Sequence, residues 1–194
     1  INISKYVKEN NILKDLEKLN TDNEVKKYLC SNTVDKKFKS EFINYIKNYG
    51  DRNIEELKLE SKTFRTSPII LVKKIIEYSN DNNLDTYLSL NVDKNLDIKI
   101  SSKLKKYLKN AEDGIRAREK SRLARSKLYG YMRSIVLSIS ENFVNEKIIE
   151  NVDDIFYLYY NEIEDVINSK NVDLKSIISS RKNEYKMYEM LPSY

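Results

Sequence analysis

The run from Ala111 to Glu146 constrains the fold more than any other part of the chain. It contains no proline and only two glycines, Gly114 and Gly130. Apolar residues recur within it at spacings of three and four, which is the period of one helix face. These residues are Ala124, Leu128, Tyr131, Ile135 and Ile139. The pattern predicts one helix of roughly 54 Å, with this apolar stripe packed in the core.

The composition indicates that the rest of the chain is helical as well. Its 194 residues include only three glycines and two prolines, too few for the many tight turns of a sheet-rich fold. We therefore expect an all-α fold and a single helical domain over 1–194. Short lead-in helices are weakly defined over 1–32, and an Asn- and Asp-rich stretch predicts a loose connector over about 80–98.

Local signals mark where several helices begin and end. Thr21 stands three residues before Glu24, the spacing of a capping box at a helix start. Ser67 followed by Pro68 fits a second start, because proline at the first helical position loses no hydrogen bond. Gly50 follows a helical run that begins near Asp35, and we expect it to end that helix in a left-handed conformation.

Missing residue types exclude several kinds of catalytic site. The chain has no histidine, so it cannot form a Ser-His-Asp triad, a zinc-protease motif or a phosphohistidine carrier. Its three glycines do not form a P-loop or a dinucleotide-binding fingerprint. Cys30 is the only cysteine, and we expect it to pack as a small hydrophobe in a reducing, cytoplasmic setting. No apolar run reaches the roughly 18–20 residues of a membrane span, and we expect no metal site.

A basic stripe lies beside the apolar stripe of the long helix, and two interpretations of it remain open. Its members are Arg118, Arg122, Arg125 and Arg133. As a site, these arginines, together with Arg52, are candidates to bind substrate or to dock another domain, since guanidinium groups bind phosphate through paired contacts. As a structural network, they would pair with carboxylates and hold helices together. The polar residues of that network are Asp51, Glu55, Glu56, Glu119, Asp153 and Asp154.

Two stretches are more specific than helix formation requires. The first reads Phe38-x3-Phe42-x2-Tyr45-x3-Tyr49-Gly50-Asp51-Arg52, with Glu55-Glu56, Phe64-Arg65 and Ser67-Pro68 after it. The second contains Arg118-Glu119-x2-Arg122-x2-Arg125 and Gly130-x2-Arg133, then Asp153-Asp154-Ile155-Phe156-Tyr157-Leu158, Glu162-Ile163 and Arg181-Lys182. In order and separation, they resemble the central helical domain of the phosphoenolpyruvate-synthase-like family, which includes pyruvate, water dikinase and the rifampicin phosphotransferases.

The resemblance implies a non-catalytic domain of a larger ATP-dependent phosphotransferase. In this family an ATP-grasp domain binds ATP with a divalent metal such as Mg²⁺, and a swivelling domain carries a phosphohistidine. Both would be partners of this chain, which we expect to be cut from a multidomain protein and to help bind a small phosphoryl acceptor or dock the moving domain. Asp51 departs from the family, whose usual residue before the arginine is histidine.

The residues also admit a second class of function. The net charge is +5, and arginine interleaved with tyrosine suits single-stranded nucleic acid. The alternative is therefore a free-standing helical module that binds an anionic partner such as RNA. Acidic residues interspersed through the chain weigh against this alternative. An interaction scaffold is a third option.

Overall fold

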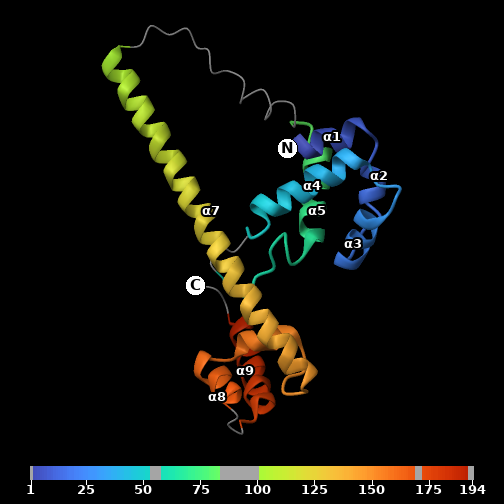
Figure 1. Ribbon diagram of the computed structural model, residues 1–194, viewed down its shortest axis with the longest axis vertical. Coiled ribbons are helices and arrows are strands. Elements are labelled where there is room, and N and C mark those ends of the chain that lie inside the picture. Colours follow the sequence, from blue (N-terminus) through green and yellow to red (C-terminus); the bar gives the residue numbers. More distant parts are fainter. Residues whose placement is uncertain (1, 53–57, 84–100, 169–171, 192–194) are drawn as a thin grey trace. The chain divides into compact units, whose positions relative to one another are not determined.

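The computed structural model describes residues 2–52, 58–83, 101–168 and 172–191, and every secondary-structure element within them is a helix. The elements are α1 (Asn2–Glu9), α2 (Leu13–Leu16), α3 (Asp22–Cys30), α4 (Lys36–Tyr49), α5 (Pro68–Asn80), α7 (Ser102–Asn145), the 3-10 helix η1 (Val152–Tyr157), α8 (Tyr160–Ile167) and α9 (Leu174–Glu189) (Figure 1). The prediction of an all-α fold around one long helix is confirmed. None of these helices is long and apolar enough to cross a membrane.

The chain divides into two compact units, each with its own hydrophobic core. Unit 1 comprises residues 1–56 and 61–127, and unit 2 comprises residues 57–60 and 128–194. The boundary falls within α7, so this one helix contributes its first half to unit 1 and its second half to unit 2. The expectation of a single domain over 1–194 stays a prediction.

The core of unit 1 forms where α1, α2 and α3 pack against α5 and α4 packs against α1 (Figure 1). The helices supply apolar residues at helical spacing, and burying them is the main favourable contribution to folding. Phe38 and Phe42 of α4 lie in this core with their ring centroids 5.7 Å apart. The other buried apolar residues are Val7, Ile12, Leu16, Val25, Val34, Ile69, Leu71, Val72 and Ile75.

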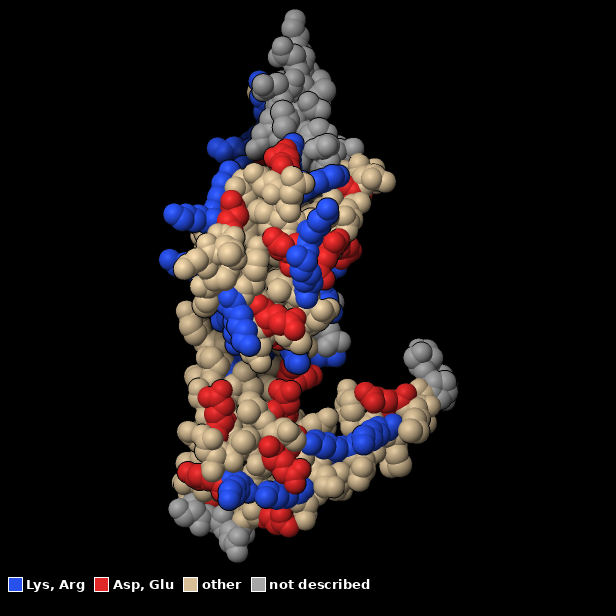
Figure 2. All heavy atoms as spheres, turned by 90° about the vertical axis from the view of Figure 1, so that its right-hand side faces the viewer, with Lys and Arg blue, Asp and Glu red and all other residues tan. Residues whose placement is uncertain are grey.

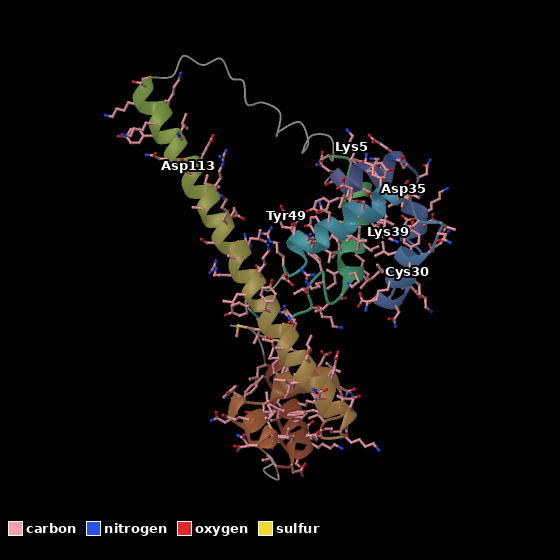
Figure 3. All side chains as sticks on the ribbon, in the orientation of Figure 1. Lys5, Cys30, Asp35, Lys39, Tyr49 and Asp113 are labelled. Atoms are coloured by element: carbon pink, nitrogen blue, oxygen red, sulfur yellow. The ribbon has the colours of Figure 1, made fainter. Side chains whose placement is uncertain are left out.

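The helix boundaries confirm some local signals and correct others. Thr21 and Glu24 form the expected capping box at the start of α3. Gly50, by contrast, has φ −61°, so the expected left-handed conformation is wrong. A side chain is excluded there for another reason, because a Cβ at Gly50 would run into the carbonyl oxygen of Ile46. Cys30 is also exposed at the end of α3 rather than packed (Figure 3).

The start of α5 depends on a residue far away in the sequence. Ser67 occupies the position before α5, as expected, but its side chain does not cap the helix. Instead, the carboxylate of Asp22 accepts a hydrogen bond from the Ile69 amide at 2.9 Å and another from the Ser67 hydroxyl at 2.9 Å. The first residue of α3 therefore caps α5 and ties the two helices together.

The long helix α7 starts earlier than expected and turns a different face to the protein. It begins at Ser102 rather than near Ala111, because the basic segment before Ala111 continues straight into it. The expected core stripe is wrong for four of its five residues, since Ala124, Leu128, Tyr131 and Ile135 are exposed, Tyr131 by 70%. Ile139 is partly buried and packs against the core of unit 2, as expected. The buried residues of α7 lie on a different face of the helix. They are Ser126, Arg133, Ser140 and Phe143.

Unit 2 forms its core between the second half of α7, η1 and α9. Phe143, Ile155 and Ile178 contribute one buried residue from each of these helices, and Ile149 and Leu174 complete the buried set. The Ser140 hydroxyl donates to the carbonyl oxygen of Val152 at 2.6 Å, which joins α7 to η1. Residues 84–98 of the predicted connector lie outside the described residues.

Candidate functional site

The candidate site residues are divided between the two units of the chain. Those in unit 1 are Asp51, Arg52, Arg118, Glu119, Arg122 and Arg125. Those in unit 2 are Arg133, Asp153 and Asp154. Glu55 and Glu56 lie outside the described residues. On the face shown in Figure 2, basic and acidic side chains are interspersed rather than separated into large single-sign patches.

The group in unit 1 is built on the turn that follows α4, which we call the Asp51 corner (residues 50–52 and 63–65). Two backbone hydrogen bonds join its halves: Arg65 donates to the carbonyl of Gly50 at 2.8 Å, and Phe64 donates to that of Arg52 at 3.4 Å. The aromatic ring of Phe64 lies 6.1 Å from that of Tyr45 on α4. The corner is therefore anchored to the helix through both its backbone and its aromatic side chains.

Asp51 is held by two hydrogen bonds from Arg65. Nε and Nη2 of Arg65 lie 2.8 and 3.0 Å from the two carboxylate oxygens, an arrangement that is stronger and more directional than a single contact. Nη2 also donates to the carbonyl of Ile46 at 3.3 Å. The side chain of Asp51 is only 17% exposed. Asp51, at the position where the family usually has histidine, thus holds the corner together.

Arg52 reaches from the corner to α7. Its Nη2 lies 3.8 Å from Oε2 of Glu119, with both side chains partly exposed. The charge of Arg52 also acts on Tyr45: burial raises the pKa of the Tyr45 hydroxyl, and the guanidinium opposes that rise. The sequence predicts Arg52 and Glu119 as members of one polar network, and the structure brings these two residues together.

The α7 arginines of unit 1 differ in exposure. Arg118 has a side chain that is 81% exposed, and its Nε lies 4.0 Å from Glu119. Arg125 is exposed, and Arg122 is half-buried. A solvated ion pair such as Arg118–Glu119 contributes little to stability. Arg118 and Arg125 are therefore available to an anionic partner.

Arg133 is buried in unit 2, where it holds two backbone segments together. Its side chain is 4% exposed, and its Nε and Nη2 donate to the carbonyl oxygens of Leu59 and Lys58, each at 2.6 Å. Its contacts with backbone oxygens fasten residues 58–59 to α7. Arg133 is accordingly separated from the surface stripe that its spacing predicts.

The acidic pair of unit 2 is split between core and surface. Asp154 is buried; it accepts the backbone N–H of Asn151 at 3.2 Å and pairs with Nζ of Lys182 on α9 at 2.5 Å. The hydrogen bond that Lys182 donates to the Asp154 carboxylate raises the pKa of Lys182. Asp153, the neighbouring residue, is exposed. Asp154 therefore joins η1 to α9.

A second ion pair in unit 2 was not among the candidates. Arg181 donates through both terminal nitrogens to the carboxylate of Glu162, at 2.6 and 2.7 Å, and also to the carbonyl of Tyr157. The guanidinium lies over the ring of Tyr159, 4.3 Å from its centroid. Glu162 and Arg181 both belong to the motif that carries the family resemblance, and this was the only sequence signal for the pair.

A small hollow in unit 1 is lined mainly by apolar and aromatic side chains. Its volume is about 200 Å³, and it lies beside the Asp51 corner because Phe64 of the corner forms part of its lining, together with the neighbouring ring of Tyr45. Other lining residues are Ile3, Ser4, Leu71, Lys74, Ile75 and Tyr78. Lys74, which pairs with Glu77 at 2.8 Å, is the cation of this lining. In the described part of the chain, no group of acidic or cysteine side chains is arranged to hold a metal ion.

Comparison of the sequence with known proteins found a partial match to one phosphotransferase. No family model matches the sequence. The chain nevertheless has a distant, partial similarity to a phosphoenolpyruvate-synthase-like enzyme.

That enzyme is rifampicin phosphotransferase of Bacillus cereus. It is 30% identical to the chain over 87 residues, which make up 45% of this chain and 10% of the enzyme. The matched stretch thus spans about a tenth of its relative.

Proposed function

We propose that the chain is a central helical domain of a phosphoenolpyruvate-synthase-like, ATP-dependent phosphotransferase. The observation that carries this proposal is the 30% identity to rifampicin phosphotransferase over 87 residues. In this role the chain is itself non-catalytic: it helps to bind the phosphoryl acceptor and to dock the domains that carry ATP and the phosphohistidine. ATP and its divalent metal bind elsewhere in the protein.

The geometry of unit 1 supports this role. The hollow beside the Asp51 corner offers apolar and aromatic side chains to an acceptor, and such lining is typical of small-molecule sites. Arg52, which the corner holds in place, is partly exposed near that lining and can neutralise a transferring or bound phosphate. Arg118 and Arg125 offer further exposed guanidinium groups to a docking domain.

The RNA-binding alternative receives less support from the structure. It needs all four arginines of the stripe on one accessible surface, but the guanidinium of Arg133 is buried on backbone carbonyls. Arg118 and Arg52 both lie close to Glu119, whose negative charge would repel a nucleic-acid backbone.

The complete reading frame that encodes the chain provides the first test. The proposal requires an ATP-binding region and a phosphohistidine motif in the same protein. A reading frame that encodes only these 194 residues would contradict the proposal.

Phosphoryl transfer by the full-length protein provides the second test. With ATP and Mg²⁺, we expect it to phosphorylate an acceptor, with rifampicin and pyruvate as the two compounds to assay by mass spectrometry. Arg52→Ala should lower kcat/KM for the acceptor about tenfold, the effect of losing roughly 1.4 kcal/mol of binding. Arg116→Ala removes an exposed arginine that pairs with Glu112 within α7, and it should leave the rate unchanged.

A further inference from the structure

The first half of α7, from Ser102 to Arg125, has no buried side chain over its first five turns. Every residue from 101 to 121 is exposed. Figure 3 shows side chains standing away from the helix on both sides around Asp113. A helix takes most of its stability from packing of its apolar face. The exposed apolar residues of this half-helix therefore indicate a surface that another molecule covers.

One row of side chains on the half-helix has the spacing of a coiled coil, and we call it the α7 seam. It consists of Leu104, Leu108, Ala111, Ile115, Arg118, Arg122 and Arg125. The intervals alternate between four and three residues, which is the a/d spacing at which a second helix packs side by side. Leu104, Leu108 and Ile115 are all exposed, Ile115 by 65%. The seam thus offers apolar contacts at one end and guanidinium groups at the other.

The charge of this half-helix indicates the chemistry of the partner. Residues 102–125 contain nine basic and three acidic side chains, a net charge of +6. The whole chain has a net charge of +5, so its positive charge is concentrated in this one segment. Charge of one sign favours encounter with a partner of the opposite sign. The partner that fits is a helix with apolar residues opposite Leu104–Ile115 and carboxylates opposite the arginines.

A second copy of the chain does not provide those contacts. In a parallel pair, the three seam arginines would face the same arginines of the other copy. In an antiparallel pair centred on Ile115, Leu108 would face Arg122. Like charges or unmatched charges at such positions are destabilising.

A lipid surface fits poorly for a related reason. An interfacial helix buries one apolar face and keeps its cations on the polar side. Here Arg118 and Arg122 continue the apolar row itself, so burying the row would also bury them.

We propose that the α7 seam binds an acidic amphipathic helix of a partner domain. The proposal goes beyond the phosphotransferase role, because the seam recognises a helix by its charge and spacing whichever activity the protein has. It also gives a binding function to residues 102–117, to which the phosphotransferase proposal assigns no contact.

A designed peptide tests the proposal with the 194-residue chain. The probe is a fluorescent 24-residue helix with leucines at the a/d positions of one half and glutamates at those of the other. Its anisotropy is measured at about 150 mM salt, where long-range attraction between exposed charges is largely screened. Single-stranded poly(U) RNA and vesicles containing phosphatidylserine are titrated in parallel. We expect the peptide to bind more tightly than either of these.

Two double variants with the same change in charge distinguish specific binding at the α7 seam from non-specific electrostatic attraction to the helix. Arg118→Glu with Arg125→Glu changes the seam, and Lys106→Glu with Lys120→Glu changes the opposite face of the helix. The seam variant should bind the peptide about tenfold more weakly, whereas the control should change its affinity less than about threefold. A peptide with lysines in place of its glutamates should restore binding to the seam variant. Helical content by circular dichroism checks that both variants fold.

Three results would overturn the proposal. One is equal loss of binding in the two double variants, which would mean unspecific attraction. Another is failure of the lysine peptide to bind the seam variant. The third is tighter binding of RNA or vesicles than of the acidic peptide, because it would assign the helix to a different class of partner.

Discussion

The guanidinium of Arg133 donates to the carbonyl oxygen of Leu59, a residue 74 positions earlier in the chain. A second nitrogen of the same group donates to Lys58. A buried cation is stable only when its donors are satisfied, and here the backbone supplies the acceptors. Arg133 therefore anchors residues 58–59 of unit 2 to α7.

Replacing Arg133 should destabilise unit 2 strongly. Arg133→Ala removes two charge-assisted hydrogen bonds and leaves two carbonyl groups without those donors, at a cost of about 2–4 kcal/mol. Urea unfolding followed by circular dichroism should show the lower midpoint. Arg125→Ala, an exposed arginine on the same helix, should change stability by less than about 0.5 kcal/mol. Similar midpoints for the two variants would show that Arg133 is not a structural anchor.

The cap that Asp22 provides to α5 can be tested in the same way. Asp22→Ala removes the acceptor of the Ile69 amide and of the Ser67 hydroxyl, and losing such a cap costs about 1–2 kcal/mol. Ser67→Ala should cost less in the wild type and close to nothing in the Asp22→Ala background, because the two side chains share one interaction. Glu17→Ala, an exposed carboxylate of unit 1, is the control. Fully additive effects of Asp22→Ala and Ser67→Ala would contradict the shared cap.

The sequence predicts the local features of this fold better than its distant contacts. The Thr21–Glu24 capping box and the position of Pro68 as the first residue of α5 are marked by local sequence signals, and both are confirmed. The cap from Asp22 joins residues more than forty positions apart, so no local pattern indicates it. Propensity and capping signals act within one or two turns, whereas such contacts depend on how the helices pack.

The inward face of α7 shows the same limit. The helix carries apolar residues on two sides, one including Leu128 and Ile135 and the other including Val136 and Phe143. Periodicity detects both sides equally, and only the packing of η1 and α9 against the second decides which is buried. The prediction that Arg133 belongs to a surface stripe failed for the same reason, because Arg133 lies on the buried side of α7. Arg52 and Glu119 were predicted from the motif that surrounds each of them, and these two residues meet.

The pair of Glu162 and Arg181 should make stability depend on pH. The hydrogen bonds from Arg181 hold the pKa of the Glu162 carboxyl below its usual range. Because that pKa is lower in the folded chain than in the unfolded chain, the stabilisation is present above about pH 4.3 and is lost as the pH falls through the folded value. Glu162→Gln should therefore lower the urea midpoint at neutral pH and flatten its dependence on pH in the acidic range. Glu164→Gln, an exposed glutamate on the same helix, should keep the wild-type profile. An unchanged profile in Glu162→Gln would argue against this linkage.

The glycines at positions 50 and 114 should respond in opposite directions to the same substitution. Gly50→Ala places a Cβ against the carbonyl oxygen of Ile46, so the Asp51 corner must shift, and overpacking of this kind costs about 1–3 kcal/mol. Gly114→Ala, within α7, meets nothing within 4 Å and removes a flexible residue from a helix, which should stabilise it by about 1 kcal/mol. Thermal melting monitored at the helical circular-dichroism band measures both. A Gly50→Ala variant as stable as wild type would show that the corner has room for a side chain, and a Gly114→Ala variant with less helix would show that α7 bends at this glycine.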